Sequence, residues 1–530
     1  MQSLVYSQKF TRQDSLSGSV TKEREWWDLQ HYNLDVKVNP EKLYISGSNT
    51  IKYKVLSSYQ VFQIDLQDPM RIIKVSQNDK SLKYTKEGSA YFIQLNNTQR
   101  IGEINEITIY FQGNPREAIN PPWDGGFTWK KDKNKNDFIA TSNQALGSSV
   151  WWPSKDHPYD EPDDGVKIIV SAPKDLVSVS NGRLINETDN KNGTKTYHWE
   201  VLNPINSYGI NLNIADYVHF SEKYQGEKGV LDCNYYVLSY NLEKAKKQFK
   251  QVSKMLQAFE HWFGPYPFYD DGYKLVEVPY LGMEHQSSIT YGNGFSNGYL
   301  GRDLSGSGWG LKFDFIIIHE SGHEWFANSI TNTDVADMWL HEGFTTYSEV
   351  LYVDYFYGTP AGNQYAIGIR KNIINDKPII GQYHVNKQGS NDMYPKGAAM
   401  IHIIRQLIKD DEKFRGILRG MNKKFYHQNV SSKQIEAYLS QQSGIDLSAF
   451  FNQYLRTVKI PVLEYSINKS IIKYRYSNIV KGFQIPVKVI INKKEKWILP
   501  SKDWQKIENN NEVSTFSVDS NFYIETKRKN

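Results

Sequence analysis

Two histidines that share one predicted helix face are the residues best suited to chemistry in this 530-residue chain. Residues 319–323 read H-E-S-G-H, so His319 and His323 stand four positions apart. On an α-helix that spacing stacks both imidazoles on the same side, where they can bind one zinc ion. Glu320 follows the first histidine, at a position from which a carboxylate can accept a proton from an attacking water without being a ligand itself.

A carboxylate on the next predicted helix supplies the third ligand. A catalytic zinc takes three protein ligands and keeps one position open, and Glu342, in the segment W-L-H-E-G at 339–343, completes a His-His-Glu set. The alternative is a surface helix with two solvated histidines. The apolar residues of 313–318 argue against it, because they predict a buried helix start whose imidazoles need partners. We therefore expect a zinc site shared by two helices.

The composition is that of a globular protein with several domains. An apolar content of 39% in 530 residues is enough for large cores. The net charge is +5, from 63 basic and 58 acidic side chains, which does not favour a nucleic acid as partner. No stretch approaches the eighteen or so apolar residues of a membrane-spanning helix, so no transmembrane segment is expected.

Compartment and assembly are left open by the sequence. The single cysteine, Cys233, excludes an intramolecular disulfide and a cysteine-rich metal site, and it does not indicate a redox compartment. Residues 1–6 are too short for a signal peptide. We expect a cytoplasmic protein if Met1 is the natural start, and a periplasmic or secreted one if a leader was removed. The oligomeric state is unknown at this stage.

The first part of the chain, residues 1–219, is predicted to be an N-terminal domain of mostly antiparallel β structure. Apolar and polar residues alternate there with period two, and turn-forming pairs such as Asn181-Gly182 separate the alternating segments. The clearest alternating segments are 32–38, 51–55, 62–66 and 107–111.

Helical periodicity begins after residue 240 and predicts a mainly α domain over 220–457. One apolar stripe runs from Leu242 to Phe263 and stops at Gly264-Pro265. A helix is expected to continue from Glu342 to Tyr357, and residues 358–392 are interpreted as a loop. Alternation returns after Tyr465, so residues 458–530 are predicted to form a small β-sandwich. The fold class is thus multidomain α+β.

Several separated motifs resemble the zinc aminopeptidases of the aminopeptidase N and leukotriene hydrolase family, which are gluzincins with a thermolysin-like catalytic domain. The zinc motif with Glu342 is similar to the family's, and 339–344 resembles its W-L-N-E-G-F sequence. Residues 281–285 resemble the exopeptidase strand G-x-M-E-N. The resemblance implies that Gly282, Met283 and Glu284 bind substrate, with the glutamate on the free α-amino group.

Two further motifs complete the resemblance, which runs from about residue 30 to 463. Gln144, with D-E-P at 160–162, is similar to the family's Q-x-x-x-A-R and D-E-P segment, whose glutamine helps to bind the same amine. Tyr394, in Y-P-K-G-A, resembles the tyrosine of Y-x-K-G-A, whose hydroxyl stabilises the tetrahedral intermediate. Read without the family, the carboxylate of Glu284 is a solvated edge residue and Tyr394 is a packing residue.

The chain departs from the family pattern at three positions. His341 replaces the asparagine before the zinc glutamate, His285 replaces the last asparagine of the exopeptidase strand, and the arginine expected after Gln144 is missing. The large helical domain that caps the cleft in many relatives is also absent from this sequence, so we expect a more open cleft.

The resemblance implies a zinc-dependent aminopeptidase with one Zn²⁺ per chain and peptides with a free N-terminus as substrates. Glu320 would act as the base and Tyr394 would hold the developing oxyanion. Asp337 and Glu349 are expected to support the ligands through hydrogen bonds, with a helix cap or surface role as the alternative for each. Other functions left open are an endopeptidase, an epoxide hydrolase or an inactive binding scaffold. The preferred first residue is not predicted.

Overall fold

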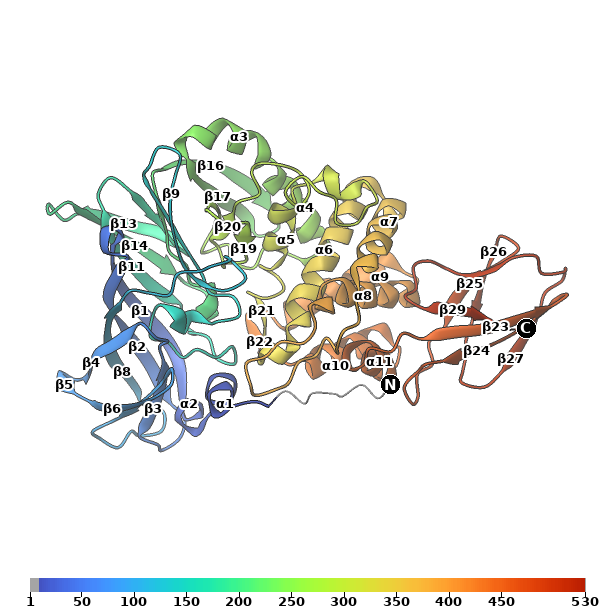
Figure 1. Ribbon diagram of the computed structural model, residues 1–530, viewed down its shortest axis with the longest axis horizontal. Coiled ribbons are helices and arrows are strands. Elements are labelled where there is room, and N and C mark those ends of the chain that lie inside the picture. Colours follow the sequence, from blue (N-terminus) through green and yellow to red (C-terminus); the bar gives the residue numbers. More distant parts are fainter. Residues whose placement is uncertain (1–8, 530) are drawn as a thin grey trace.

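The computed structural model describes residues 9–529, and its N-terminal part is built on a long twisted sheet of eight strands (Figure 1). Apolar side chains alternate inward along these strands, as their period of two predicts. All neighbours are antiparallel except β1 and β11, which run parallel. In spatial order the strands are β13 (Arg183–Asp189), β14 (Thr194–Val201), β11 (Val166–Pro173), β1 (Trp27–Asn39), β2 (Tyr44–Val55), β8 (Ile104–Gly113), β4 (Arg71–Gln77) and β5 (Lys80–Ser81).

Two smaller sheets and two short helices complete this part. The predicted β-rich N-terminal domain is confirmed. The first sheet has the order β3 (Val61–Asp65), β7 (Ala90–Gln94) and β6 (Lys83–Glu87), and the second has the order β12 (Val177–Val179), β15 (Asn213–Ala215), β10 (Asp137–Ser142) and β9 (Gly126–Lys131). The helices α1 (Arg12–Gly18) and α2 (Lys22–Glu25) precede the first strand.

A five-stranded sheet begins the next part of the chain. Its order is β16 (Tyr217–Gly226), β17 (Gly229–Leu238), β18 (Tyr273–Glu277), β20 (Ile289–Tyr291) and β19 (Gly282–Met283). The expected division between residues 219 and 220 falls inside β16, which pairs along its whole length with β17. The strand that precedes Glu284 lies at the open edge of the sheet, as the sequence suggested.

Helices dominate the rest of this central part. Their bounds are α3 (Leu242–Gln248), α4 (Gln251–Phe263), α5 (Phe315–Gly322), α6 (Trp339–Tyr357), α7 (Thr359–Ile369), α8 (Pro395–Ile408), α9 (Asp411–Lys424), α10 (Ser432–Ser443) and α11 (Ser448–Arg456), with the short strands β21 (Ile330–Asn332) and β22 (Gln428–Val430) pairing between them. Among the described residues, no helix combines the length and apolar character needed to cross a membrane.

The helix α7 corrects the prediction of a loop over 358–392. Its glycines hide the helical pattern, because glycine has low helix propensity. Both are needed for close packing: a Cβ at Gly362 would lie 2.9 Å from the Asp354 Cβ, and one at Gly368 would lie 2.3 Å from the Ser305 carbonyl oxygen. The formation of this helix therefore depends on tertiary contacts that cannot be predicted from the sequence pattern.

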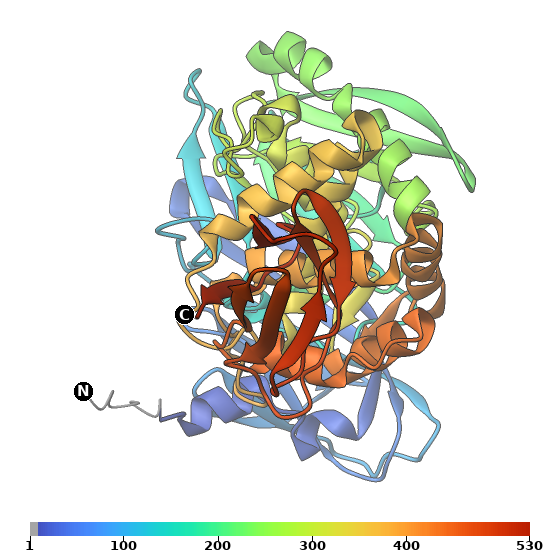
Figure 2. The same ribbon diagram turned by 90° about the vertical axis from the view of Figure 1, so that its right-hand side faces the viewer.

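The C-terminal part is a small pair of sheets, as predicted, and it packs on the helical part (Figure 2). Its apolar residues join the core of the helical part in one continuous cluster, whereas the long sheet has a core of its own. One sheet has the order β27 (Gln505–Glu508), β24 (Ile471–Ser477), β23 (Val462–Asn468) and β29 (Glu525–Arg528), and the other has β26 (Lys494–Ile498), β25 (Val487–Ile491) and β28 (Phe516–Val518).

Two glycines let α6 and α8 touch close to the predicted site residues Glu342 and Tyr394. Gly343 follows Glu342 on α6, and Gly397 lies three residues after Tyr394 on α8. A Cβ at Gly397 would lie 2.8 Å from the Gly343 Cα. Since real Cβ atoms do not approach another carbon so closely, the distance between these helices depends on both residues being glycine.

Gly397→Ala is therefore expected to lower the free energy of unfolding by about 1–3 kcal/mol, because a methyl group forces the two helices apart. Gly416, on the exposed face of α9, offers a matched control, because a Cβ added there would meet no heavy atom within 4 Å. Gly416→Ala should raise stability by up to about 1 kcal/mol. Urea denaturation of the two variants tests this, and equal effects would contradict the packing argument.

Candidate active site

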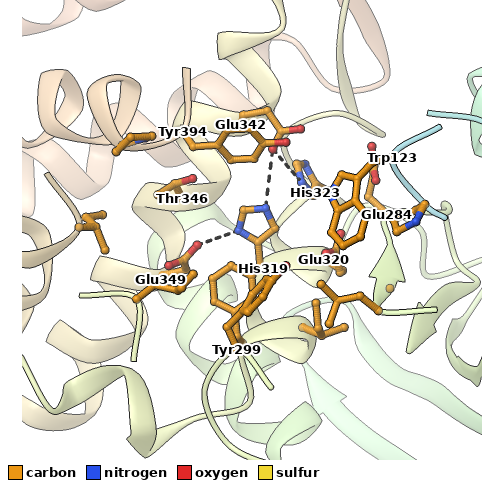
Figure 3. Close-up of a pocket in the computed structure, with 18 of the residues that line it drawn as sticks. Trp123, Glu284, Tyr299, His319, Glu320, His323, Glu342, Thr346, Glu349 and Tyr394 are labelled. Atoms are coloured by element: carbon orange, nitrogen blue, oxygen red, sulfur yellow. Dashed lines mark hydrogen bonds and ion pairs between the residues drawn. The ribbon is translucent and has the colours of Figure 1, made fainter. Parts of the chain in front are cut away.

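The three predicted metal ligands converge in the structure. His319 comes from α5, His323 from the residue that ends it, and Glu342 from the first turn of α6. Potential ligand atoms of the three residues all lie within 4.8 Å of one another, and all three side chains are buried. The Glu342 Oε2 lies 3.7 Å from Nε2 of His319 and 3.4 Å from Nε2 of His323 (Figure 3).

Hydrogen bonds on the far side of each ring orient the two imidazoles. His319 Nδ1 lies 2.7 Å from Glu349 Oε1, and His323 Nδ1 lies 3.0 Å from the Phe326 carbonyl oxygen. Both rings thus use Nδ1 for protein contacts and direct Nε2 toward Glu342. The second Glu349 oxygen accepts a 2.5 Å hydrogen bond from the Tyr365 hydroxyl. Glu349 therefore orients the ring of His319, one of the three predicted ligands.

The residues present fit a zinc ion. The Glu342 Oε2 is buried and has no hydrogen-bond partner among the described residues, an arrangement that costs free energy unless a cation or donor compensates it. Burial disfavours the charge of this carboxylate, but the neighbouring His323 and His319 hold its pKa well below the ordinary value. Two imidazoles and one ionised carboxylate form a donor set that zinc prefers.

Glu320 lies in the same cavity without joining the ligand group. Glu320 is 8% exposed, and burial raises the pKa of its carboxylate above the ordinary range for a glutamate. It lines the cavity beside His319 and His323 and remains accessible from it. A raised pKa makes a carboxylate a better proton acceptor, so its placement suits a general base.

Glu284 and Gln144 meet on the other side of the cavity, although 140 positions separate them. The Gln144 side-chain nitrogen lies 3.5 Å from Glu284 Oε1. Glu284 is 4% exposed, and burial raises its pKa. The structure thus brings together one residue from the N-terminal part and one from the edge of the five-stranded sheet.

The two residues before Glu284 are placed differently from each other. Gly282 lines the cavity, and a Cβ at this position would lie 2.7 Å from the side chain of Ile316 on α5. Met283 is 1% exposed and packs with Val278 and Tyr280, in a small core away from the cavity. Its side chain therefore has no place among the cavity-lining groups, and only its backbone belongs to the strand beside them.

The Tyr394 ring stacks on the first zinc-motif histidine. The centroids of the Tyr394 and His319 rings are 6.1 Å apart and the ring planes differ by 24°. Burial raises the pKa of Tyr394 well above the ordinary value, and the charges of Glu342 and Glu284 raise it further. The hydroxyl is consequently a neutral hydrogen-bond donor at the cavity wall, one that an oxyanion can use.

Asp337 does not reach the ligand group. It accepts a 2.6 Å hydrogen bond from the Tyr383 hydroxyl and a 2.9 Å bond from the Ser432 backbone nitrogen, so it ties a loop and α10 to the start of α6. The two histidines that replace family asparagines are buried, and burial lowers the pKa of each to about 3. His341 accepts a hydrogen bond from the Asn332 backbone nitrogen, and His285 contacts Thr290.

The reaction cavity has a volume of about 250 Å³ and includes residues that the sequence reasoning missed. Trp123, from a loop of the N-terminal part, is 52% exposed and lines the same cavity as Glu284 and Glu320 (Figure 3). The turn Pro-Pro-Trp-Asp-Gly-Gly contains a large aromatic residue, which is unusual in a solvated loop. This residue type was the sequence feature that could have predicted a place at the cavity. A second cavity of about 70 Å³ adjoins the first and shares Gln144 and Glu284 with it.

A buried His-His-Glu set with a nearby carboxylate, shared by two helices that follow a β-rich N-terminal part, is a group that could hold a catalytic metal ion. Residues 247–454 match the peptidase family M1 domain, and residues 29–208 match the peptidase M1 N-terminal domain. The chain belongs to peptidase family M1, which confirms the resemblance seen in its motifs.

Curated relatives of this chain are aminopeptidases and a related hydrolase. Probable aminopeptidase 2 of Sulfurisphaera tokodaii is 22% identical over 529 residues, with 94% of this chain and 62% of the relative covered. Aminopeptidase B of Mus musculus is 25% identical over 351 residues, with 61% and 50% covered. Leukotriene A-4 hydrolase of Xenopus laevis is 26% identical over 289 residues, with 51% and 44% covered. This chain spans less than two thirds of each of these relatives.

Solved structures share the fold over most of this chain. An M1 zinc metallopeptidase from Deinococcus radiodurans superposes with a TM-score of 0.70 at 21% identity, with 83% of this chain and 95% of that chain covered. A mutant of an M1 zinc metallopeptidase from the same organism, bound to a Tyr-Ser-Ala substrate, gives a TM-score of 0.71 at 20% identity, with 84% of this chain and 98% of that chain covered.

Metal content should separate the ligands from the carboxylate beside them. His323→Ala is expected to lose bound zinc, because only two ligands remain, whereas Glu320→Gln should keep it. Metal analysis of the two purified, folded variants after dialysis checks this. Equal zinc content in both variants would contradict the assignment of the ligand set.

Proposed function

We propose that this chain is a zinc-dependent aminopeptidase that removes the first residue of peptides with a free N-terminus. His319, His323 and Glu342 would hold one zinc ion per chain. When bound, zinc supplies Lewis-acid chemistry: it lowers the pKa of a water and polarises the carbonyl of the scissile peptide bond. The proposal extends the family assignment to an activity and a substrate class.

The observation that carries this function is the buried carboxylate of Glu284 in the reaction cavity, paired with Gln144. A buried carboxylate needs a compensating partner, and one neutral amide at 3.5 Å is weak compensation. The ammonium group of a peptide N-terminus is a cation of suitable size that donates three hydrogen bonds. Binding it there would fix the first peptide bond, and no later one, beside the catalytic groups.

Proton transfer in this proposal belongs to Glu320. Its carboxylate would take a proton from the attacking water and later donate that proton to the nitrogen of the leaving peptide. Tyr394 would keep its own proton and donate a hydrogen bond from its hydroxyl to the oxygen on which negative charge develops. Glu320 is buried and Tyr394 is partly buried, which supports these roles, since electrostatic interactions are stronger away from bulk water.

Tyr394→Phe is expected to lower kcat with little change in KM, because the hydroxyl acts on charge that exists only in the transition state. Removing one such donor costs about 3–4 kcal/mol, or roughly a hundredfold to a thousandfold in rate. Steady-state kinetics on one peptide, with zinc content measured in parallel, checks this. Kinetics close to wild type would leave Tyr394 with a packing role alone.

Glu284→Ala is expected to reduce kcat/KM severely for a free-amine peptide, by a few kcal/mol in binding of the transition state, while zinc stays bound. Gln144→Ala should act in the same direction but more mildly, as the loss of a neutral hydrogen bond does. The decisive measurement compares one peptide, free and N-acetylated, on wild type and on Glu284→Ala.

The acetylated peptide discriminates the alternatives. An aminopeptidase should cleave it slowly with both proteins, so that the difference between wild type and Glu284→Ala disappears. Equal cleavage of free and acetylated peptide by wild type would favour an endopeptidase. Absence of turnover on any peptide by the zinc-loaded protein would favour a binding scaffold.

A further inference from the structure

An N-terminal segment outside the matched family domains lies between the two parts of the molecule that form the cavities. The family match begins at residue 29, whereas α1 and α2 precede it. In Figure 1 these helices lie on the side of the long sheet that faces the helical part. Thr11 starts α1 with a capping box, in which its side chain and that of Asp14 each satisfy a backbone nitrogen of the other residue.

A buried arginine fixes the end of α1 to the N-terminal part. Arg24 is fully buried, and its guanidinium donates to the carbonyl oxygens of Leu16 and Ser19 at 2.8 Å each. The same group pairs with Asp65 of β3 at 2.5 Å. A planar guanidinium with several acceptors holds a fixed orientation, so the turn after α1 is rigidly placed.

The last residue of α1 presses directly on a loop of the helical part. Gly18 is buried, and a Cβ at this position would lie 1.9 Å from the Asn386 backbone nitrogen and 2.4 Å from the Val385 carbonyl carbon. No side chain fits between these two backbones. Residue 18 is therefore glycine because of this close approach.

The loop that Gly18 contacts lines the smaller of the two cavities. Asn386 and Gln388 line this cavity together with Gln144 and Glu284. The start of the loop is also anchored, because Asp334 accepts a 2.9 Å hydrogen bond from the backbone nitrogen of residue 384. The position of this wall thus depends on the segment that carries Gly18.

We propose that residues 11–26 act as a positioning segment for the loop 382–388, with Gly18 as the contact that sets the width of the smaller cavity. The inference rests on the proposed function, in which Glu284 and Gln144 bind the substrate ammonium. The side chain of the first residue is attached to the same carbon as that ammonium, so it would enter the adjoining cavity, which Gln144 and Glu284 also line. The segment would thereby influence which first residue is accepted.

The test compares Gly18→Ala with the control Gly416→Ala, both loaded with zinc, on two peptides that are identical except for alanine or leucine as first residue. The ratio of the two kcat/KM values is the readout, because a general loss of stability lowers both values together. We expect Gly18→Ala to change this ratio at least about fivefold, or roughly 1 kcal/mol, and the control to leave it unchanged. An unchanged ratio in Gly18→Ala, or an equal change in the control, would overturn the proposal.

A second readout needs no activity and covers the case in which Gly18→Ala does not fold. Lys387 is an exposed trypsin site within the loop. Thr11→Ala removes the exposed cap of α1 and should speed cleavage after Lys387 severalfold relative to wild type and to Gly416→Ala. Cleavage at the wild-type rate would refute the positioning role. If wild type does not cleave free-amine peptides, the proposed function fails, while the trypsin rates still decide whether the segment holds the loop.

Discussion

Four buried carboxylates around one cavity would repel one another without a compensating positive charge. Glu284, Glu320, Glu342 and Glu349 all line the reaction cavity and are all buried. Two imidazoles lie among these carboxylates, and a divalent cation held by His319, His323 and Glu342 would balance their charge. The carboxylates come from the residue that follows β19, from α5 and from α6. These elements therefore hold one cluster of charged groups in place. The glycine contact between α6 and α8 is part of this support.

Sequence patterns predicted the parts of this cluster that lie close together along the chain. The four-residue spacing of His319 and His323 predicts that both lie on one helix face. The strands of the N-terminal part are predicted by apolar residues that recur with period two. Glu349, the hydrogen-bond partner of His319, could also be proposed from the sequence, since it lies on the same helix face as Glu342. The contact between Gln144 and Glu284 was expected only from the family resemblance, because no local pattern joins two residues so far apart.

Residues whose position depends on packing between distant elements could not be predicted in this way. The orientation of Met283 toward a small core, the hydrogen bonds of Asp337 to Tyr383 and Ser432, and the presence of Trp123 at the cavity all depend on contacts between separate parts of the chain. The helix α7 escaped prediction for the same reason. Its glycines allow neighbouring elements to pack closely, and they weaken the local helical pattern.

The hydrophobic core shared by the helical part and the C-terminal sheets has a consequence for how the molecule comes apart. Tyr454 of α11 donates a 2.8 Å hydrogen bond to the Tyr523 carbonyl oxygen, and His402 of α8 contacts Asn521. Apolar residues of both parts belong to one continuous cluster. The C-terminal sheets are thus not an independent domain joined to the helical part by a flexible linker. They cover one side of the helix that begins next to Tyr394, and heat should melt the two parts in a single cooperative transition.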